Sequence, residues 1–374
     1  MKFISSIGLI ALASASAFAQ PAEIPFDSVA HFLKLPPNMY LGEASGVAVN
    51  SKKHVFVFSR GNSTGPAYGA TASQLLEFDP LGNYIREIGH NLYAWSFAHA
   101  VRIDKNDNIW AIDKGSDMII KFDPQGRVMM VFGRKKEASD EGSGPWTRVN
   151  PPRPPVDGQF RQPTDVTWDT EGNIFISDGY VNSRVAKFDK NGKWLKSFGV
   201  PVPAEDRANP KPGQLSTPHS IAADAKGNIY VADRGNHRIQ VFDPEGTYQR
   251  SIVIDVPPPP DVQPWMGPKP TPQQASGGGI NAAGTPWAIC ITPGPTQYLF
   301  ASDSYPGRVY KLALDGTVLG YLGTSGRQLK EFGWIHELAC PAENEVYVAE
   351  LLNWRVQKLI LKPAGAGATH TGGR

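Results

Sequence analysis

The chain has 374 residues, of which 41% are hydrophobic and 19% are charged, so it is long enough to bury a large core. Its formal net charge is +2 and its basic residues are dispersed, which argues against a nucleic-acid partner or an anionic surface. These figures favour a single folded domain, and they leave the function to be inferred from individual residues.

The first segment, MKFISSIGLIALASASAFAQ, has the features of a secretory signal peptide. It contains Lys2, an apolar run and the small-residue pattern Ala17-Phe18-Ala19. We expect residues 1–19 to be removed and the mature protein to be periplasmic or secreted. The run is too short and too rich in Ser and Ala to span a membrane, and no other segment is a candidate span.

The next predicted element is a strand over residues 29–35 (VAHFLKL), which has no hairpin partner beside it. From residue 46 on, a sequence motif that predicts three short strands occurs six times. It is clearest at 217–246, TPHSIAADAKGNIYVADRGNHRIQVFDPEG, where β-branched and aromatic runs alternate with turns of Gly, Asn, Asp and Pro. The other copies lie at 46–82, 100–126, 165–192, 288–316 and 337–363, and most of the six are followed by a fourth strand that ends in Gly.

Six units of four antiparallel strands predict an all-β fold, a six-bladed β-propeller over residues 20–363. The sixth unit has only three strands before a Gly/Ala-rich tail at 364–374, which we expect to be disordered. The strand at 29–35 is therefore expected to become the outer strand of the last blade and to close the ring. Pro/Gly-rich insertions at 134–163, 200–217 and 257–286 are expected to form surface loops over one mouth.

Three further side chains belong to these loops or their ends. Trp146 and Trp265 are expected to pack against the body of the propeller, whereas Trp287 is a candidate wall of a pocket. The two cysteines, Cys290 and Cys340, fall in predicted innermost strands. An exported chain permits a disulfide, but its geometry cannot be inferred from the sequence, and we expect two buried free thiols.

Alignment of the six units on their first strands places histidine in units two, four and six. The aligned residues are Ser45, His99, Thr164, His219, Trp287 and His336. In a sixfold ring, alternate innermost strands lie about 120° apart around the central channel, so three imidazoles would converge at one height. Three protein ligands with a fourth position left open is the pattern of a catalytic zinc site. A single histidine there would be interpreted as structural, but three equivalent ones favour a metal.

The second strands return to the same mouth. The residues just past their ends are Arg60, Lys114, Gly179, Arg234, Ser304 and Leu351. Arg60 and Arg234 are candidates to hold a substrate carboxylate or oxyanion. The alternative is that each arginine pairs with an acid of a neighbouring blade, among them Asp113, Asp178, Asp233 and Asp303, which are themselves expected to tie turns together. For Arg60 we favour substrate binding, because its own unit has Ser59 in place of the acid, and for Arg234 both interpretations stand.

Tyr180 lies at this mouth and is a candidate general base, since a metal and arginines lower the pKa of a nearby phenol. Tyr305 occupies the matching place in unit five, so aromatic packing is the alternative. Glu337 follows the third histidine and points to the opposite face of its strand, where it could reach a second cation or another blade. The sequence has no nucleophilic serine motif, phosphate-binding glycine loop or HExxH.

Five phrases of the sequence resemble the peptidyl-α-hydroxyglycine α-amidating lyase family, and the repeated phrase resembles NHL repeats. They are VFSRGN, FAHAVRID, FISDGYVNSR, PHSIAADAKGNIYVADR and IHELA. The resemblance implies that His99, His219 and His336 hold zinc, that Tyr180 is the base, and that Arg60 and Arg234 orient the substrate. It also implies a structural calcium ion in the channel, held by Glu337 and the main-chain carbonyls of Val47 and Val101, and a substrate pocket that includes Trp334, Trp287 and Lys114.

This chain departs from the family's pattern at three points. Val181 stands where the family has a cysteine, so the family's disulfides are missing, and Trp334 stands where a methionine is usual. Glu337 replaces an aspartate. The sequence also has no copper monooxygenase domain, so a separate hydroxylating monooxygenase would have to supply the substrate for peptide amidation.

The resemblance implies a zinc-dependent lyase that splits a small-molecule or peptide carbinolamide into an amide and glyoxylate. One alternative is a non-catalytic propeller that binds a peptide, glycan or protein across its loop-covered mouth. Another is a calcium-dependent lactonase, which would need a channel rich in Asp, Asn and Glu. We rank it last because the aligned channel positions carry histidine.

Overall fold

The computed structural model describes residues 21–61, 73–135, 154–265, 267–269, 271 and 282–363. Within them the regular structure consists of β-strands and two three-residue 3-10 helices, η1 (Ala204–Asp206) and η2 (Arg234–Asn236). The predicted signal peptide, the predicted disordered tail and Trp146 lie outside the described residues.

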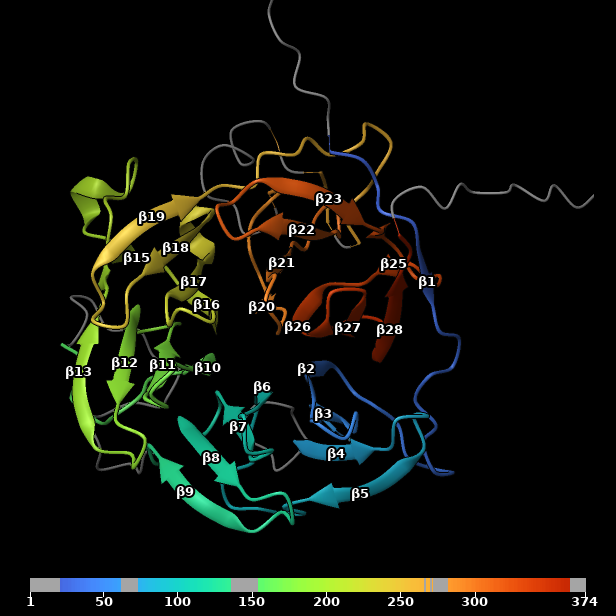
Figure 1. Ribbon diagram of the computed structural model, residues 1–374, viewed down its shortest axis with the longest axis horizontal. Coiled ribbons are helices and arrows are strands. Elements are labelled where there is room, and N and C mark those ends of the chain that lie inside the picture. The colour runs from blue at the N-terminus through green and yellow to red at the C-terminus, as the bar shows by residue number, and fades with distance from the viewer. Residues whose placement is uncertain are drawn as a thin grey trace, which may run out of the picture.

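Six four-stranded antiparallel sheets stand around a central channel (Figure 1). The first three blades are β2 (Ala44–Val49), β3 (Val55–Ser59), β4 (Gln74–Phe78) and β5 (Tyr84–Ile88); β6 (Ala98–Ile103), β7 (Ile109–Asp113), β8 (Met118–Phe122) and β9 (Val128–Phe132); and β10 (Asp165–Trp168), β11 (Ile174–Asp178), β12 (Arg184–Phe188) and β13 (Trp194–Phe198). The fourth and fifth are β16 (Pro218–Ala223), β17 (Ile229–Asp233), β18 (Arg238–Phe242) and β19 (Tyr248–Ile252); and β20 (Ile289–Ile291), β21 (Tyr298–Ser302), β22 (Val309–Ala313) and β23 (Val318–Leu322).

The sixth blade is β26 (Ile335–Ala342), β27 (Glu345–Glu350) and β28 (Arg355–Leu361), completed by β1 (Phe26–Ser28) from the other end of the chain. Figure 1 shows the first strand of each unit at the centre and the fourth at the rim. Two short parallel pairs, β14 (Val200–Pro201) with β15 (Gln214–Leu215) and β24 (Thr324–Ser325) with β25 (Glu331–Phe332), lie outside the blades. The predicted six-bladed propeller is confirmed.

The N-terminal segment closes the ring, as predicted, but the residues predicted to do so were wrong. The closing strand is β1, in which Phe26 pairs with Leu361, and not the segment 29–35. Phe26 is buried in the cluster between blades five and six, which anchors the strand there. Phe32, in the segment predicted as a strand, instead packs with Leu41 and Tyr347 on the opposite side of blade six.

The core lies between neighbouring blades. Between blades one and two, for example, Phe58 and Leu75 of one blade pack with Ile109 and Ile120 of the next in one buried cluster. Each sheet therefore buries both of its faces only because neighbouring blades cover them. A single four-stranded unit could not bury its apolar faces alone.

Acidic residues at the ends of the second strands tie the turns of the blades together, as predicted. Asp113 accepts hydrogen bonds from the main-chain N–H groups of Ser96, Phe97 and Ser116. Asp178, Asp233 and Asp303 accept similar bonds in blades three to five, and Glu350 does so in blade six. In blades two to six these bonds fix the start of the innermost strand against the end of the second strand, and so set the height at which channel side chains lie.

The two cysteines form a disulfide, so the expectation of free thiols was wrong. Cys290 lies on β20 and Cys340 on β26, the innermost strands of adjacent blades, and their Cα atoms are 6.0 Å apart. That separation lies in the range that a disulfide requires. The sequence placed both residues on innermost strands but gave no means of measuring the distance across the blade boundary.

Candidate metal centre

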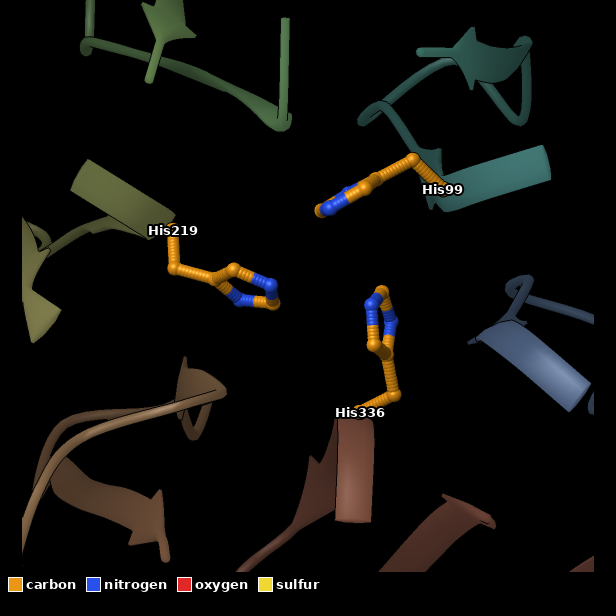
Figure 2. A group of neighbouring side chains, drawn as sticks. All are labelled: His99, His219 and His336. Atoms are coloured by element: carbon orange, nitrogen blue, oxygen red, sulfur yellow. The ribbon is translucent and has the colours of Figure 1, made fainter. Parts of the chain in front are cut away.

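Three histidines from alternate blades meet on the channel axis. His99 on β6, His219 on β16 and His336 on β26 are buried, and their candidate ligand atoms all lie within 4.8 Å of one another. Figure 2 shows the three rings approaching a common centre from three sides. Their ring centroids are 4.6 to 4.9 Å apart. The structure therefore brings together the three residues that the alignment of the repeats singled out.

The intervening blades fix the orientation of these rings. The Nδ1 atom of each histidine lies at hydrogen-bond distance from the carbonyl oxygen of the aligned residue in the next blade. The pairs are His99 with Thr164 (2.7 Å), His219 with Trp287 (2.8 Å) and His336 with Ser45 (2.7 Å). A carbonyl oxygen only accepts, so each Nδ1 carries the proton and each Nε2 keeps a free lone pair. This is how metal-binding imidazoles are commonly held.

The electrostatic setting also keeps the imidazoles neutral. Burial lowers the pKa of all three well below the usual 6.5, and the charge of Lys114 lowers each further. Arg60 adds to the effect at His99 and His336, and Arg234 at His219 and His336. The Nε2 atom of His219 is buried and has no hydrogen-bond partner among the described residues. A buried nitrogen without a partner is costly unless a ligand fills it. A neutral, all-imidazole donor set of three suits a zinc ion with one open position.

Tyr180 directly borders the histidines. It follows β11 in the turn after Gly179, and its hydroxyl lies 3.3 Å from Nε2 of His99. A Cβ atom on Gly179 would lie 2.0 Å from the carbonyl oxygen of Pro218, so only glycine allows the chain to pass here. Tyr305, the matching residue of blade five, instead donates to the carbonyl oxygen of Val262 (3.4 Å). The two tyrosines therefore differ in their contacts, although the sequence places them equivalently.

Cationic side chains surround Tyr180. The Nζ atom of Lys114 lies 3.8 Å from the centre of the Tyr180 ring, and the guanidinium carbon of Arg234 lies 5.4 Å from it. Burial raises the pKa of Tyr180, but the charges of Arg234, Lys114 and Arg60 outweigh it, so that the net pKa lies below the usual 10.0. A tyrosine in this setting can act as a base at a lower pH than an exposed one.

Arg60 also reaches the mouth, but it has an acidic partner. Its guanidinium forms an ion pair with Glu43, which precedes the innermost strand of the same blade, and its Nε donates to the carbonyl oxygen of Ala98 (3.1 Å). The same guanidinium lies 3.8 Å from the centre of the Phe97 ring. The alternative interpretation for Arg60 was a pair with an acid of a neighbouring blade. The acid that it contacts is instead Glu43 of its own blade, which the sequence reasoning did not consider.

Two tryptophans line the other side of the cluster. The ring of Trp287 lies 5.0 Å from that of His219 and 5.1 Å from that of Trp334, measured between centroids. Arg234 lies 4.1 Å above the Trp287 ring. Trp265 instead packs against blade six. Its Nε1 donates to the side-chain oxygen of Asn353 (3.3 Å), in agreement with the expected loop packing.

The residues expected to hold calcium are arranged differently. Glu337 accepts hydrogen bonds from the main-chain N–H groups of Val47 (2.9 Å) and Val101 (3.1 Å), so these residues meet the carboxylate as donors. The other carboxylate oxygen lies 3.1 Å from Nε of Arg102. Sequence reasoning missed Arg102, because it occurs in one unit and has no counterpart in the aligned positions of the others.

Comparisons with known proteins agree with the motifs. A model of the NHL repeat matches residues 215–242. The chain is 31% identical over 259 residues to mouse peptidyl-glycine alpha-amidating monooxygenase, covering 61% of this chain and 24% of that protein. It is 24% identical over 352 residues to peptidyl-alpha-hydroxyglycine alpha-amidating lyase 1 of Drosophila melanogaster, covering 86% of this chain and 58% of that protein.

A solved structure of a gluconolactonase from Xanthomonas campestris matches with a TM-score of 0.55 at 14% identity, covering 92% of this chain and 97% of that one, which shows the shared fold alone. The resemblance to the amidating lyases and to NHL repeats is confirmed. The chain spans about a quarter of the length of the mouse monooxygenase and little more than half of the fly lyase. Among the described residues, no helix is long and apolar enough to cross a membrane.

Proposed function

We propose that this protein is a zinc-dependent lyase that cleaves the C–N bond of an α-hydroxyglycine-type carbinolamide and releases an amide and glyoxylate. The observation that carries the proposal is the set of three neutral imidazoles whose Nε2 atoms are left for a shared ion, with a low-pKa tyrosine beside them. The similarity to proteins named amidating lyases supports this choice among zinc chemistries.

His99, His219 and His336 would hold the zinc, because their Nδ1 atoms are already engaged. When bound, zinc supplies a Lewis acid that lowers the pKa of a hydroxyl group beside it. Tyr180 would accept the proton of the substrate's α-hydroxyl, and the 3.3 Å between its hydroxyl and Nε2 of His99 supports this role.

The cations at the mouth have two tasks in this reaction. Lys114 and Arg234 favour the phenolate form of Tyr180, since both lie over its ring. Arg234 would pair with the substrate carboxylate and balance charge as the C–N bond breaks, whereas Arg60, which is paired with Glu43, would assist through its charge at the mouth. The proton taken from the hydroxyl balances the proton gained by the leaving amide nitrogen, so the products are a neutral amide and glyoxylate.

The apolar walls suggest where the rest of the substrate lies. Trp287 and Trp334 stand beside the histidines, and a bulky aromatic pair favours an apolar or aromatic acyl group next to the amide. A peptide or a small aromatic acyl group would satisfy this. We further propose that the mature protein is secreted or periplasmic after loss of residues 1–19, and that a separate hydroxylating monooxygenase supplies its substrate.

The test is to incubate the purified protein with α-hydroxyhippurate and to measure glyoxylate. We expect glyoxylate from the zinc-loaded protein, loss of the activity after removal of zinc by a chelator, and recovery after zinc is returned. A folded, zinc-loaded sample that yields no glyoxylate would overturn the lyase proposal. If the folded protein instead fails to bind zinc, the non-catalytic binding propeller becomes the better interpretation.

A further inference from the structure

A second cluster of buried charges lies deeper in the channel, beyond the histidines. Its centre is Arg102, three residues after His99 on β6. Asp165 on β10 and Glu337 on β26 lie on either side of it, and these two carboxylates are 1% and 2% exposed. Buried charges of this kind are stable only when they are paired and hydrogen-bonded, so each partner matters.

Arg102 is bonded on every side. Its Nε and Nη2 atoms donate to the two oxygens of Asp165 at 2.8 and 2.5 Å. Nη1 donates to the carbonyl oxygen of Leu338 (3.0 Å), and Nη2 also reaches Ser220 Oγ (3.1 Å) and the carbonyl oxygen of Ile289 (3.3 Å). The guanidinium thus joins its own blade to blades three, four, five and six.

Glu337 extends the network to the remaining blade. One of its oxygens accepts the N–H groups of Val47 on β2 and Val101 on β6, and the other lies 3.1 Å from Nε of Arg102. Gly46 allows this approach, since a Cβ atom there would lie 2.7 Å from the carboxylate. The six innermost strands are therefore connected through one guanidinium and one carboxylate.

This is the arrangement that a divalent cation would otherwise provide. Two buried carboxylates and the main-chain carbonyls of Leu338 and Ile289 are the hard oxygen ligands that calcium takes. Here all four groups face Arg102. The N–H groups of Val47 and Val101, which compensate the negative charge of Glu337, cannot bind a cation.

We propose that the guanidinium of Arg102 is the resident cation of the channel floor and takes the place of a second, calcium-type metal ion, so that the protein binds no calcium beneath its histidines. This assignment holds whether or not the histidines bind zinc. It replaces the calcium site that the family resemblance implied for Glu337, Val47 and Val101.

Arg102 also faces the far end of the channel. A cavity of about 340 Å³ opens at the far end, and its lining includes Arg102, Cys290 and Cys340 but none of the three histidines. Arg102 is thus the charged member of this cluster that faces the cavity, and its side chain is 13% exposed.

The proposal is tested by measuring the Tm of the full chain in EGTA and in 1 mM calcium. For the wild type we expect the two values to agree within about 1 °C, because Arg102 already occupies the oxygen-rich site of the channel floor. For Arg102→Ser we expect a Tm lower by about 10 °C in EGTA and a rise of several degrees in calcium, because removal of the guanidinium leaves two carboxylates and two carbonyl oxygens around a space.

Arg184→Ser is the matched control. Arg184 is 2% exposed and pairs with Asp178 at 3.1 Å, together with the carbonyl oxygens of Val156 and Gln159, but it has one carboxylate partner where Arg102 has two. We expect a similar loss of Tm without recovery in calcium. A calcium-dependent Tm in the wild type, or calcium copurifying with it at one ion per chain, overturns the proposal even if the Arg102 variant does not fold. An Arg102→Ser protein that responds to calcium no more than Arg184→Ser also overturns it.

Discussion

The two ends of the central channel are built from the same six strands but differ in how their polar groups are satisfied. At the mouth, three imidazoles direct Nε2 atoms to a common point, the Nε2 of His219 has no hydrogen-bond partner within the described chain, and the nearby charges are cationic. At the floor, Arg102 donates to both oxygens of Asp165 and forms an ion pair with Glu337, whose Oε1 lies 3.1 Å from its Nε. The mouth is therefore organised to receive a ligand, whereas the floor already contains its own.

The difference arises from a small change along the strand. His99 and Arg102 lie on the same strand, β6, and His336 and Glu337 are adjacent on β26. The strand register shifts between Ala98 and Ala100 on β6 and between Ile335 and Glu337 on β26, so both histidines lie at β-bulges. Each of these two strands supplies one residue to the metal centre and another to the network that holds the blades together. Substitutions at the two ends should thus have separable effects, on activity at the mouth and on stability at the floor.

The largest expected effect at the mouth is that of His219→Ala. This change removes one of three ligands and should abolish both zinc retention and glyoxylate release, since two imidazoles hold zinc far less tightly than three. Metal analysis and the glyoxylate assay check it. His90→Ala, an exposed histidine beside Glu87, is the control and should retain both. An active His219→Ala protein would contradict the assignment of the metal centre.

Tyr180→Phe should reduce turnover by about 10²- to 10⁴-fold, the usual contribution of a general base. Zinc content should not change, because the hydroxyl is not one of the three imidazole ligands. Tyr305→Phe, at the matching position of blade five, is the control and should leave turnover unaltered. A loss smaller than about tenfold in Tyr180→Phe would exclude the tyrosine as the base.

At the floor, Asp165→Ala should lower the free energy of unfolding by about 3–5 kcal/mol, because it leaves a guanidinium that is only 13% exposed without its main partner. Denaturant unfolding measures this. Activity per folded, zinc-loaded molecule should remain close to that of the wild type, which separates the floor from the mouth. Asp27→Ala removes an exposed acid that pairs with Lys362 and should change stability little. An Asp165→Ala protein as stable as the wild type would contradict the assignment of the channel floor as a stabilising network.

The smallest effect is expected for Lys114→Met. The ammonium group over the Tyr180 ring favours the phenolate and lowers the pKa of the tyrosine. Without it the pKa rises, so the limb of the pH–rate profile that requires the deprotonated base should move to higher pH, while the rate on the alkaline plateau changes by a few-fold at most. Lys121→Met, which removes a similar contact over Trp110, should leave the profile in place. A shift of this limb to lower pH would contradict the inference that Lys114 lowers the pKa of Tyr180.

Much of the fold and the core of the candidate site could be predicted because the chain repeats itself. The recurring turns and strands predicted six blades, and alignment of the repeats located His99, His219 and His336. The same alignment contained Ser45, Thr164 and Trp287, but their contribution is a backbone carbonyl, which any residue provides, so no side chain marked it. Alignment of the repeats could therefore predict which side chains form the site, but not which main-chain groups orient them.

Features that break the repeat could not be predicted in this way. Arg102 and Glu43 occur in single units, so no pattern distinguished them from ordinary surface charges. The closing strand is three residues long and is placed by the burial of Phe26, a choice that depends on the shape of blade six. The Cys290–Cys340 bond likewise depends on the distance between two blades.

The most direct test of the metal centre is a titration of zinc-free protein with zinc while glyoxylate release from α-hydroxyhippurate is followed. The account predicts that activity is absent at first, rises in proportion to added zinc and levels off at about one ion per chain, the capacity of a single three-histidine site. Full activity in the zinc-free protein, or a folded protein that gains no activity as zinc binds, would contradict it.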